Sequence, residues 1–174
     1  MKKIELLPLK GIRINGTDEI NLGSKITEVE RILGKPSSTD RNNYYYDDIE
    51  VRMDFDRKNK LEFIEFIEGP FSDKIELSIY GVNPFSTPAK ELIEILLKNG
   101  NNNIDDSEAE YAYTFPNISV GVWRDLTEEV VNNTIKELKE NGEYEKSREW
   151  IENDLLKSKY FWTIGIGIKD YYDN

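Results

Sequence analysis

The chain has 174 residues, 38% of them hydrophobic and 33% charged, and its 34 acidic and 23 basic residues give a net charge of −11. The absence of Cys and His excludes disulfides, thiolate nucleophiles, histidine bases and the usual zinc or iron ligand sets. The acidity argues against nucleic acid or an anionic membrane as partner and favours a basic protein, although acidity also serves solubility.

The first part of the chain predicts an interrupted strand followed by an amphipathic helix. Residues 3–14 alternate weakly between apolar and polar types, and a proline and a glycine break the pattern, which is typical of a broken or edge strand. Apolar residues within 26–33 fall on one helical face. Ser24 is the candidate N-cap of this helix, and Gly34 is its predicted end.

Three antiparallel strands are predicted next. Residues 44–47 and 49–56 are close enough for a tight hairpin, and the second of them shows the clearest period-two alternation in the chain. Residues 60–68 form the third strand, but their apolar pattern slips phase twice. The slips indicate a bulge or two partly covered faces; a helix is the competing interpretation, and the neighbouring strands and turns favour a strand.

The second half predicts a similar series of elements. A strand over 75–80 leads into a helix that starts near Thr87 and ends at Gly100, and strands follow over 111–115 and 118–122. An inserted segment then interrupts the series before the last strand.

The insertion comprises residues 125–159 and is helical by composition. Asp125 and Glu128 resemble a capping box at its start. The last strand covers 160–168, where apolar residues alternate with Thr and Gly.

Two sequence patterns occur twice in the chain. Lys-Ile-Glu-Leu at residues 3–6 recurs at 74–77, and the spaced aromatic and aliphatic pattern of 44–53 recurs at 113–122. The duplication predicts an α+β fold of two tandem repeats, each a strand, a helix and a three-stranded antiparallel meander, with the helices on one sheet face. The expected boundaries are residues 1–70 for the first repeat and 71–174 for the second, which carries the helical insertion, and the two repeats are expected to form one continuous unit.

The helix 26–33, followed by Gly34-Lys35-Pro36 and by the tyrosines at 44–46, resembles the SmpA/OmlA-type outer-membrane lipoproteins. It also resembles the tandem-repeat β-lactamase inhibitor proteins, whose two copies form one concave sheet that grips an enzyme. The resemblance implies an α+β repeat fold and a protein-binding sheet.

The sequence departs from both families in its cysteines. It has neither the lipobox cysteine of the lipoproteins nor the disulfide cysteines of the secreted inhibitors. A secretory signal or an apolar stretch of membrane-spanning length is also missing, so the expected location is the cytoplasm. A small, acidic, cysteine-free protein of this layout resembles, by type, the immunity proteins of bacterial toxin systems.

Catalytic and metal sites are not expected. Neighbouring carboxylates occur at 47–48, 54–56 and 105–106, but chance adjacency is expected among 34 acidic residues. The Asn- and Asp-rich loop 99–108 lacks the spacing of an EF-hand, although weak cation binding there remains an alternative. We therefore expect a protein that is not an enzyme and that needs no cofactor.

Small residues of the second repeat are expected to share one sheet face. Our first interpretation is that the inserted helices over 126–157 pack on this flat patch, and the alternative is a groove for a partner. The residues concerned are Ser119, Gly121, Thr163, Gly165 and Gly167.

In the first repeat, tyrosine and carboxylates are expected opposite the apolar face, where they suit recognition of Lys and Arg on a protein, although an ordinary solvated face would look the same. The leading hypothesis is a cytoplasmic immunity protein that occludes the basic surface of a cognate toxin. The alternatives are a non-inhibitory scaffold or assembly module and a carboxylate-dependent hydrolase. The candidate partner-binding residues are Tyr45, Asp47, Asp48, Glu50, Asp54 and, as an aromatic anchor, Trp123.

Overall fold

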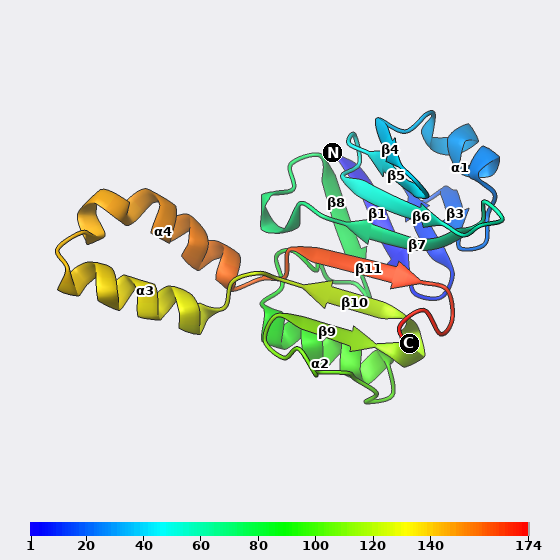
Figure 1. Ribbon diagram of the computed structural model, residues 1–174. Helices are drawn as coiled ribbons and strands as arrows, with labels where there is room; N and C mark the ends of the chain where they lie inside the picture. Colours follow the sequence, from blue (N-terminus) through cyan, green and yellow to red (C-terminus); the bar gives the residue numbers. More distant parts are fainter. Residues whose placement is uncertain (174) are drawn as a thin grey trace.

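The computed structural model describes residues 1–173 and shows an α+β fold with two packed sheets and a helical hairpin that projects from one end (Figure 1). The smaller sheet has the order β3-β2-β1-β8 and consists of β1 (Lys2–Leu7), β2 (Gly11–Ile14), β3 (Asp18–Asn21) and β8 (Ile75–Ile79). The larger sheet has the order β4-β5-β6-β7-β11-β10-β9 and consists of β4 (Ser38–Asp40), β5 (Asn43–Tyr46), β6 (Val51–Phe55), β7 (Leu61–Phe66), β9 (Ala112–Phe115), β10 (Val120–Trp123) and β11 (Thr163–Gly167).

The helices lie at or near their predicted positions. They are α1 (Ile26–Leu33), α2 (Ala89–Asn99), α3 (Glu128–Glu140) and α4 (Tyr144–Ser158), with 3-10 turns η1 (Gly69–Phe71) and η2 (Pro116–Ile118).

Two predicted helix caps are displaced by one or two residues. Helix α1 has Lys25, not Ser24, at its N-cap, and the Glu28 carboxylate accepts the backbone N–H of Lys25 at 2.8 Å. Helix α3 is capped by Thr127, whose hydroxyl accepts a backbone N–H of the first turn at 3.3 Å, rather than by Asp125. Both caps satisfy donors that a helix leaves unpaired at its start.

The core lies between the two sheets, and α1 and α2 also contribute buried residues to it. Alternate side chains of the central strands point into it, as the period-two patterns predicted. Fully buried members include Ile4, Leu6 and Leu77 from the smaller sheet, Met53, Ile64, Val120 and Ile166 from the larger sheet, and Val29, Leu92 and Leu96 from the helices.

Both sheets join the two halves of the chain. In the smaller sheet β1 pairs with β8 in parallel, so the repeated Lys-Ile-Glu-Leu segments lie side by side with a stagger that places Lys3 opposite Glu76. In the larger sheet β7 pairs with β11 in antiparallel fashion. The short strands β3 and β4 were not predicted from the sequence.

The phase slip in the third strand is a β-bulge. Along the β6–β7 pair, Asp54 lies opposite Phe63 whereas Phe55 lies opposite Leu61, so Glu62 is the extra residue. The prediction of a bulged strand is confirmed and the helical alternative is wrong. The bulge lets both Leu61 and Ile64 face the core while Phe63 points to the opposite side.

The β5–β6 and β9–β10 hairpins share an unusual turn. Each has four residues between its paired strand ends, and the last of the four has a left-handed backbone, Glu50 at φ 55° and Ser119 at φ 49°. The Glu50 carbonyl accepts the N–H of Ile67 at 3.3 Å, and the Ser119 carbonyl accepts the N–H of Gly167 at 2.9 Å. The two turns therefore bind the following strand of their own half in the same way.

The inserted helices α3 and α4 pack mainly on each other and extend away from the sheets (Figure 1). Val131 and Ile151 are buried between them, whereas Trp150 keeps 46% of its surface exposed. The expectation that these helices cover the glycine-rich patch of the second repeat is wrong.

Candidate functional site

The larger sheet has one face on the core and a second, open face. Directly paired residues of adjacent antiparallel strands point to the same side of a sheet. Across the open face, successive pairs join Tyr45 to Arg52, Arg52 to Glu65, Glu65 to Gly165 and Gly165 to Gly121. Large polar side chains therefore occupy one half of this row, and glycines occupy the other half.

Arg52 lies between two carboxylates on the open face. Its Nη1 is 3.1 Å from Glu65 Oε2, and its Nη2 donates to Asp54 Oδ2 at 3.2 Å. Arg52 Nε lies 3.1 Å from Asp54 Oδ1 at ion-pair distance, but these two buried atoms are not aligned for a hydrogen bond and have no other partner within residues 1–173. The guanidinium also lies 5.6 Å from the centre of the Phe63 ring.

This cluster contains one more negative than positive charge. Burial raises the pKa of Asp54 and of Glu65 above the usual range, although the nearby Arg52 acts in the opposite direction. One guanidinium thus compensates the two half-buried carboxylates only in part.

The glycines of the open face make room for aromatic rings. A Cβ on Gly121 would collide with Tyr172, and one on Gly165 would collide with Phe63. Tyr171 stacks on Phe63 with ring centres 4.5 Å apart and planes 3° apart. Burial raises the pKa of Tyr171 to about 12 and that of Tyr172 further. The C-terminal tyrosines, rather than the inserted helices, therefore cover the patch.

A cavity of about 250 Å³ remains on the open face beside the tyrosines. Its walls combine aromatic rings, two threonines and the Arg52–Glu65 pair, which is the mixture of apolar surface and few polar groups typical of ligand sites. It is lined by Arg52, Phe63, Glu65, Ala112, Thr114, Gly121, Val122, Trp123, Thr163, Tyr171 and Tyr172.

Three of the six predicted partner-binding residues lie on the open face. Tyr45 and Asp54 belong to neighbouring strands β5 and β6, and Trp123 lies on β10 beside the cavity. Trp123 is 42% exposed, so it is available as an aromatic contact.

The other three predicted residues lie in the β5–β6 turn and not on this face. Asp48 forms an exposed ion pair of 2.6 Å with Lys2, and the backbone carbonyl of Asp47 accepts a hydrogen bond from a lysine. Glu50 is only 5% exposed and its carboxylate accepts a hydrogen bond from Ser72. Its predicted place opposite the apolar face of the strand is wrong because its left-handed backbone lies outside the alternating strand.

Sequence reasoning missed several residues of the site. Phe63 and Glu65 were assigned to a strand of uncertain phase, and only the bulge at Glu62 determines which side they face. Tyr171 and Tyr172 follow the last predicted strand, and no periodic pattern indicates that they fold back. The Gly165 and Gly167 pair was the available signal, because a strand lacking side chains admits another group closely.

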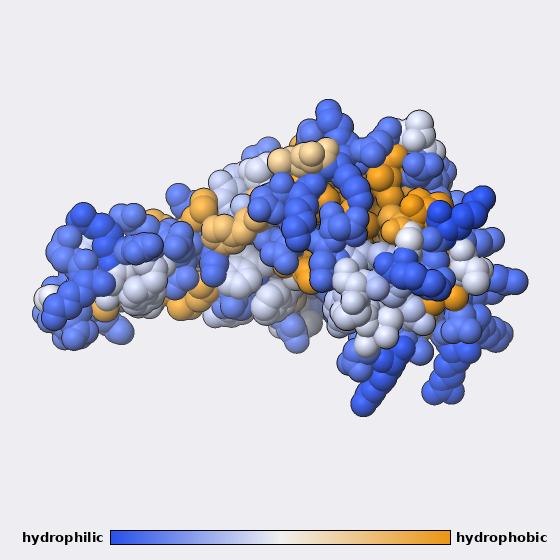
Figure 2. All heavy atoms as spheres, turned by 90° about the horizontal axis from the view of Figure 1, so that it is seen from above, coloured by the Kyte–Doolittle hydropathy of each residue, from blue (hydrophilic) through white to orange (hydrophobic). Residues whose placement is uncertain are grey.

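A second group of aromatic residues lies where the hairpin joins the body, and Figure 2 shows hydrophobic residues at this junction. The Trp123 and Trp162 rings meet edge to face with centres 6.1 Å apart. Lys157 Nζ lies 4.9 Å from the centre of the Trp162 ring and 5.5 Å from that of Phe71, which is 45% exposed. The exposed aromatic surface of the open face thus continues to the base of the hairpin.

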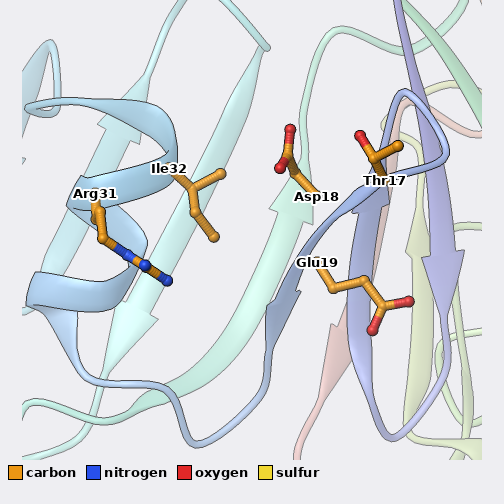
Figure 3. A pocket seen from close by; sticks show the side chains of 5 residues that line it. All are labelled: Thr17, Asp18, Glu19, Arg31 and Ile32. Atoms are coloured by element: carbon orange, nitrogen blue, oxygen red, sulfur yellow. The ribbon is translucent and has the colours of Figure 1, made fainter.

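A larger but more polar hollow, of about 410 Å³, lies between β3 and α1. Figure 3 shows Arg31 and Ile32 of α1 on one side of it and Asp18 and Glu19 on the other, with the Glu19 side chain directed away from α1. The Glu19 carboxylate is engaged by Arg13 at 2.8 Å. The hollow lacks the aromatic walls of the open-face cavity, so it is the weaker candidate for a site.

Residues 1–173 contain no group of three or more Asp, Glu, His or Cys placed to hold a metal ion. No helix in the described part of the chain is both long and apolar enough to cross a membrane. Comparison with known protein families, curated proteins and solved structures gives no match.

Proposed function

We propose that this protein is an inhibitory binding protein of the immunity type, which neutralises a cognate bacterial toxin in the cytoplasm by covering a basic surface. The observation that carries the proposal is the open face, where exposed Trp123 and partly exposed Tyr45 flank a carboxylate-rich cluster. Aromatic residues dominate the binding energy of protein interfaces, and complementary charge accelerates and orients association. The net charge of −11 favours the same class of partner.

The tandem-repeat architecture is part of this proposal. Its support is the equal geometry of the Glu50 and Ser119 turns and the mirrored strand order on the two sides of β7 and β11. In this interpretation residues 1–70 and 71–174 are two copies that share both sheets and one core. The duplication would double the width of the sheet and so provide a face wide enough for a protein partner.

Inhibition would follow from occlusion. A toxin that acts on an anionic substrate presents a basic site, and an acidic sheet face held over that site excludes the substrate without further chemistry. Asp54 and Glu65 would contribute the charge, and Trp123 with Tyr45 the desolvated contacts. Asp48 and Glu50 take no part, because one is paired with Lys2 and the other is buried.

The experiment is recovery of the partner on the tagged protein, followed by an assay of the partner's own activity with and without added protein. Trp123→Ala is the test variant and Trp150→Ala the matched control, since their exposed fractions are 42% and 46% and Trp150 lies on the projecting hairpin. We expect Trp123→Ala to lose inhibition and Trp150→Ala to retain it. A partner whose activity is unchanged by saturating protein would contradict the inhibitory function.

The alternative is a non-inhibitory scaffold or assembly module. It is favoured by the projecting hairpin, which exposes Val130 and Leu156 at 39% and 42% in addition to Trp150. A scaffold would bind through this arm and leave the partner active. The same pair of tryptophan variants separates the two functions, because a scaffold would be weakened by Trp150→Ala.

A further inference from the structure

The cavity of the open face has the composition of a site for a cationic group. Glu65 provides a half-buried carboxylate at its wall, and Trp123, Phe63 and Tyr172 provide rings. Aromatic faces attract cations, and a guanidinium is the cation that combines stacking on a ring with paired hydrogen bonds to a carboxylate.

The charge balance of the ion-pair cluster at the cavity wall also favours a cation. Arg52 lines the cavity but is shared by Asp54 and Glu65, so the three groups together carry one surplus negative charge. Of these three groups Arg52 and Glu65 line the cavity and Asp54 lies outside its lining, so an anion entering it would meet the Glu65 carboxylate and a guanidinium already engaged by two carboxylates. A cation would supply the missing positive charge. The pKa values of both carboxyl groups are raised for the same reason, because their charges are buried and Arg52 compensates them only in part.

The cavity lies beside the point where two paired glycines of the sheet admit the rings of Tyr172 and Phe63. Gly121 and Gly165 are paired neighbours on β10 and β11, between the Glu65 side and the Thr114 side of the row. The Tyr172 and Phe63 rings lie over these glycines, and a volume of about 250 Å³ remains beside the rings. Trp123 and Thr163, also a direct pair, limit it along the strands.

We infer that this cavity receives the guanidinium of an arginine side chain presented by the protein partner, with Glu65 as its acceptor and Trp123 as its stacking surface. The inference rests on the proposed function, since it takes the cation from a protein surface. It adds that the partner binds through one arginine side chain inserted into the cavity, and not only through the general attraction between a basic surface and an acidic one.

The test is an NMR titration of the ¹⁵N-labelled protein with doubly capped arginine, N-acetyl-arginine methylamide, and with its neutral citrulline counterpart. We expect saturable shifts of the Gly121 and Gly165 amides and of the Trp123 indole N–H with the arginine probe. Citrulline should bind about tenfold more weakly or worse, because it removes a charge-assisted contact to a carboxylate.

Two variants locate the contact. Glu65→Gln should weaken the arginine probe about tenfold, whereas Glu62→Gln, which removes a charge from the same strand outside the cavity lining, should not. Trp123→Ala should weaken it too, and this exposed position keeps the fold testable if Glu65→Gln does not fold.

Equal binding of arginine and citrulline probes, or an unchanged affinity in folded Glu65→Gln, would overturn the inference. Much tighter binding of free arginine than of the capped probe would overturn the assignment to a protein side chain. The probe titration needs no partner, so a negative result would not contradict the proposed function, which the inhibition assay tests. A negative inhibition assay would likewise not contradict binding of the probe in the cavity.

Discussion

The ring of Tyr172 occupies the space that a side chain on Gly121 would need. Gly121 and Tyr172 lie 51 positions apart in the sequence (172 − 121). They are brought together because the segment after β11 folds back over the open face. The backbone of Gly121 is not in the left-handed region, so the glycine is required by the ring and not by the turn of the chain.

We expect Gly121→Ala to destabilise the protein by about 1–3 kcal/mol, because the added methyl group must displace the Tyr172 ring. The measurement is the free energy of unfolding in urea. The control is a double-mutant cycle, in which most of the cost of Gly121→Ala should disappear in a Tyr172→Ala background. Additive effects of the two substitutions would contradict the contact.

Ser72→Ala should destabilise the protein by about 1–3 kcal/mol, since it leaves the buried Glu50 carboxylate without its hydrogen-bond donor. Thermal or chemical denaturation measures the loss. Ser86→Ala, at an exposed serine, is the matched control and should have little effect. If Ser72→Ala instead changed the association with the partner and not the stability, Glu50 would again have to be counted among the partner-binding residues.

The hydrogen bonds of Asp56 in the turn after β6 predict that the stability of the protein depends on pH. The backbone N–H groups of Lys60 and Lys58 donate to Asp56 Oδ1 at 2.9 and 2.7 Å and hold the pKa of this carboxyl below its usual range. A carboxyl whose pKa is lowered in the folded state stabilises the folded protein at pH values above its unfolded pKa of about 3.9. This contribution is lost as the pH falls through the folded pKa.

Asp56→Ala should therefore lower the melting temperature at pH 7, and the difference from the unmodified protein should shrink as the pH falls below about 4. Melting curves between pH 7 and pH 2.5 provide the measurement. The comparison variant is Asp73→Ala, at an exposed carboxylate without such backbone donors among the described residues. A difference that stays constant with pH would show that Asp56 acts through turn propensity alone.

The projecting hairpin is expected to be dispensable for the fold. Trp123 and Thr163 are directly paired where the insertion leaves and re-enters the sheet, so a short Gly/Ser linker can replace residues 128–155. This replacement keeps Lys157 and Ser158, whose carbonyls accept hydrogen bonds from Trp162 and Arg124. We expect the shortened protein to unfold in a cooperative transition and the NMR shifts of the residues around Gly121 and Tyr172 to stay unchanged. Loss of cooperative folding would show that the hairpin stabilises the body.

Secondary structure could be predicted from the sequence because its signals are local. The helices near 26–33 and 89–99, the two hairpins and the last strand follow from apolar periodicity and from glycine and proline positions. The short strands over 18–21 and 38–40 were missed, since three or four residues carry too little alternation to distinguish a strand from a loop.

The candidate site could be predicted only in part, because two of its determinants are not local. Alternation placed Glu50 opposite the apolar face, but its own left-handed backbone removes it from the strand, and its carboxylate is buried. The bulge at Glu62 reverses which residues of β7 face outward. The placement of Tyr172 depends on a contact with Gly121 that no pattern in either segment specifies.

The pairing of β1 with β8 and of β7 with β11 has a consequence for synthesis of the chain. Strand β1 pairs with a strand that is made more than sixty residues later, and the centre of the larger sheet closes only when residues 163–167 have been made. Because each sheet contains strands from both halves, a nascent chain exposes unpaired strand edges until those residues have been made, and such edges favour aggregation.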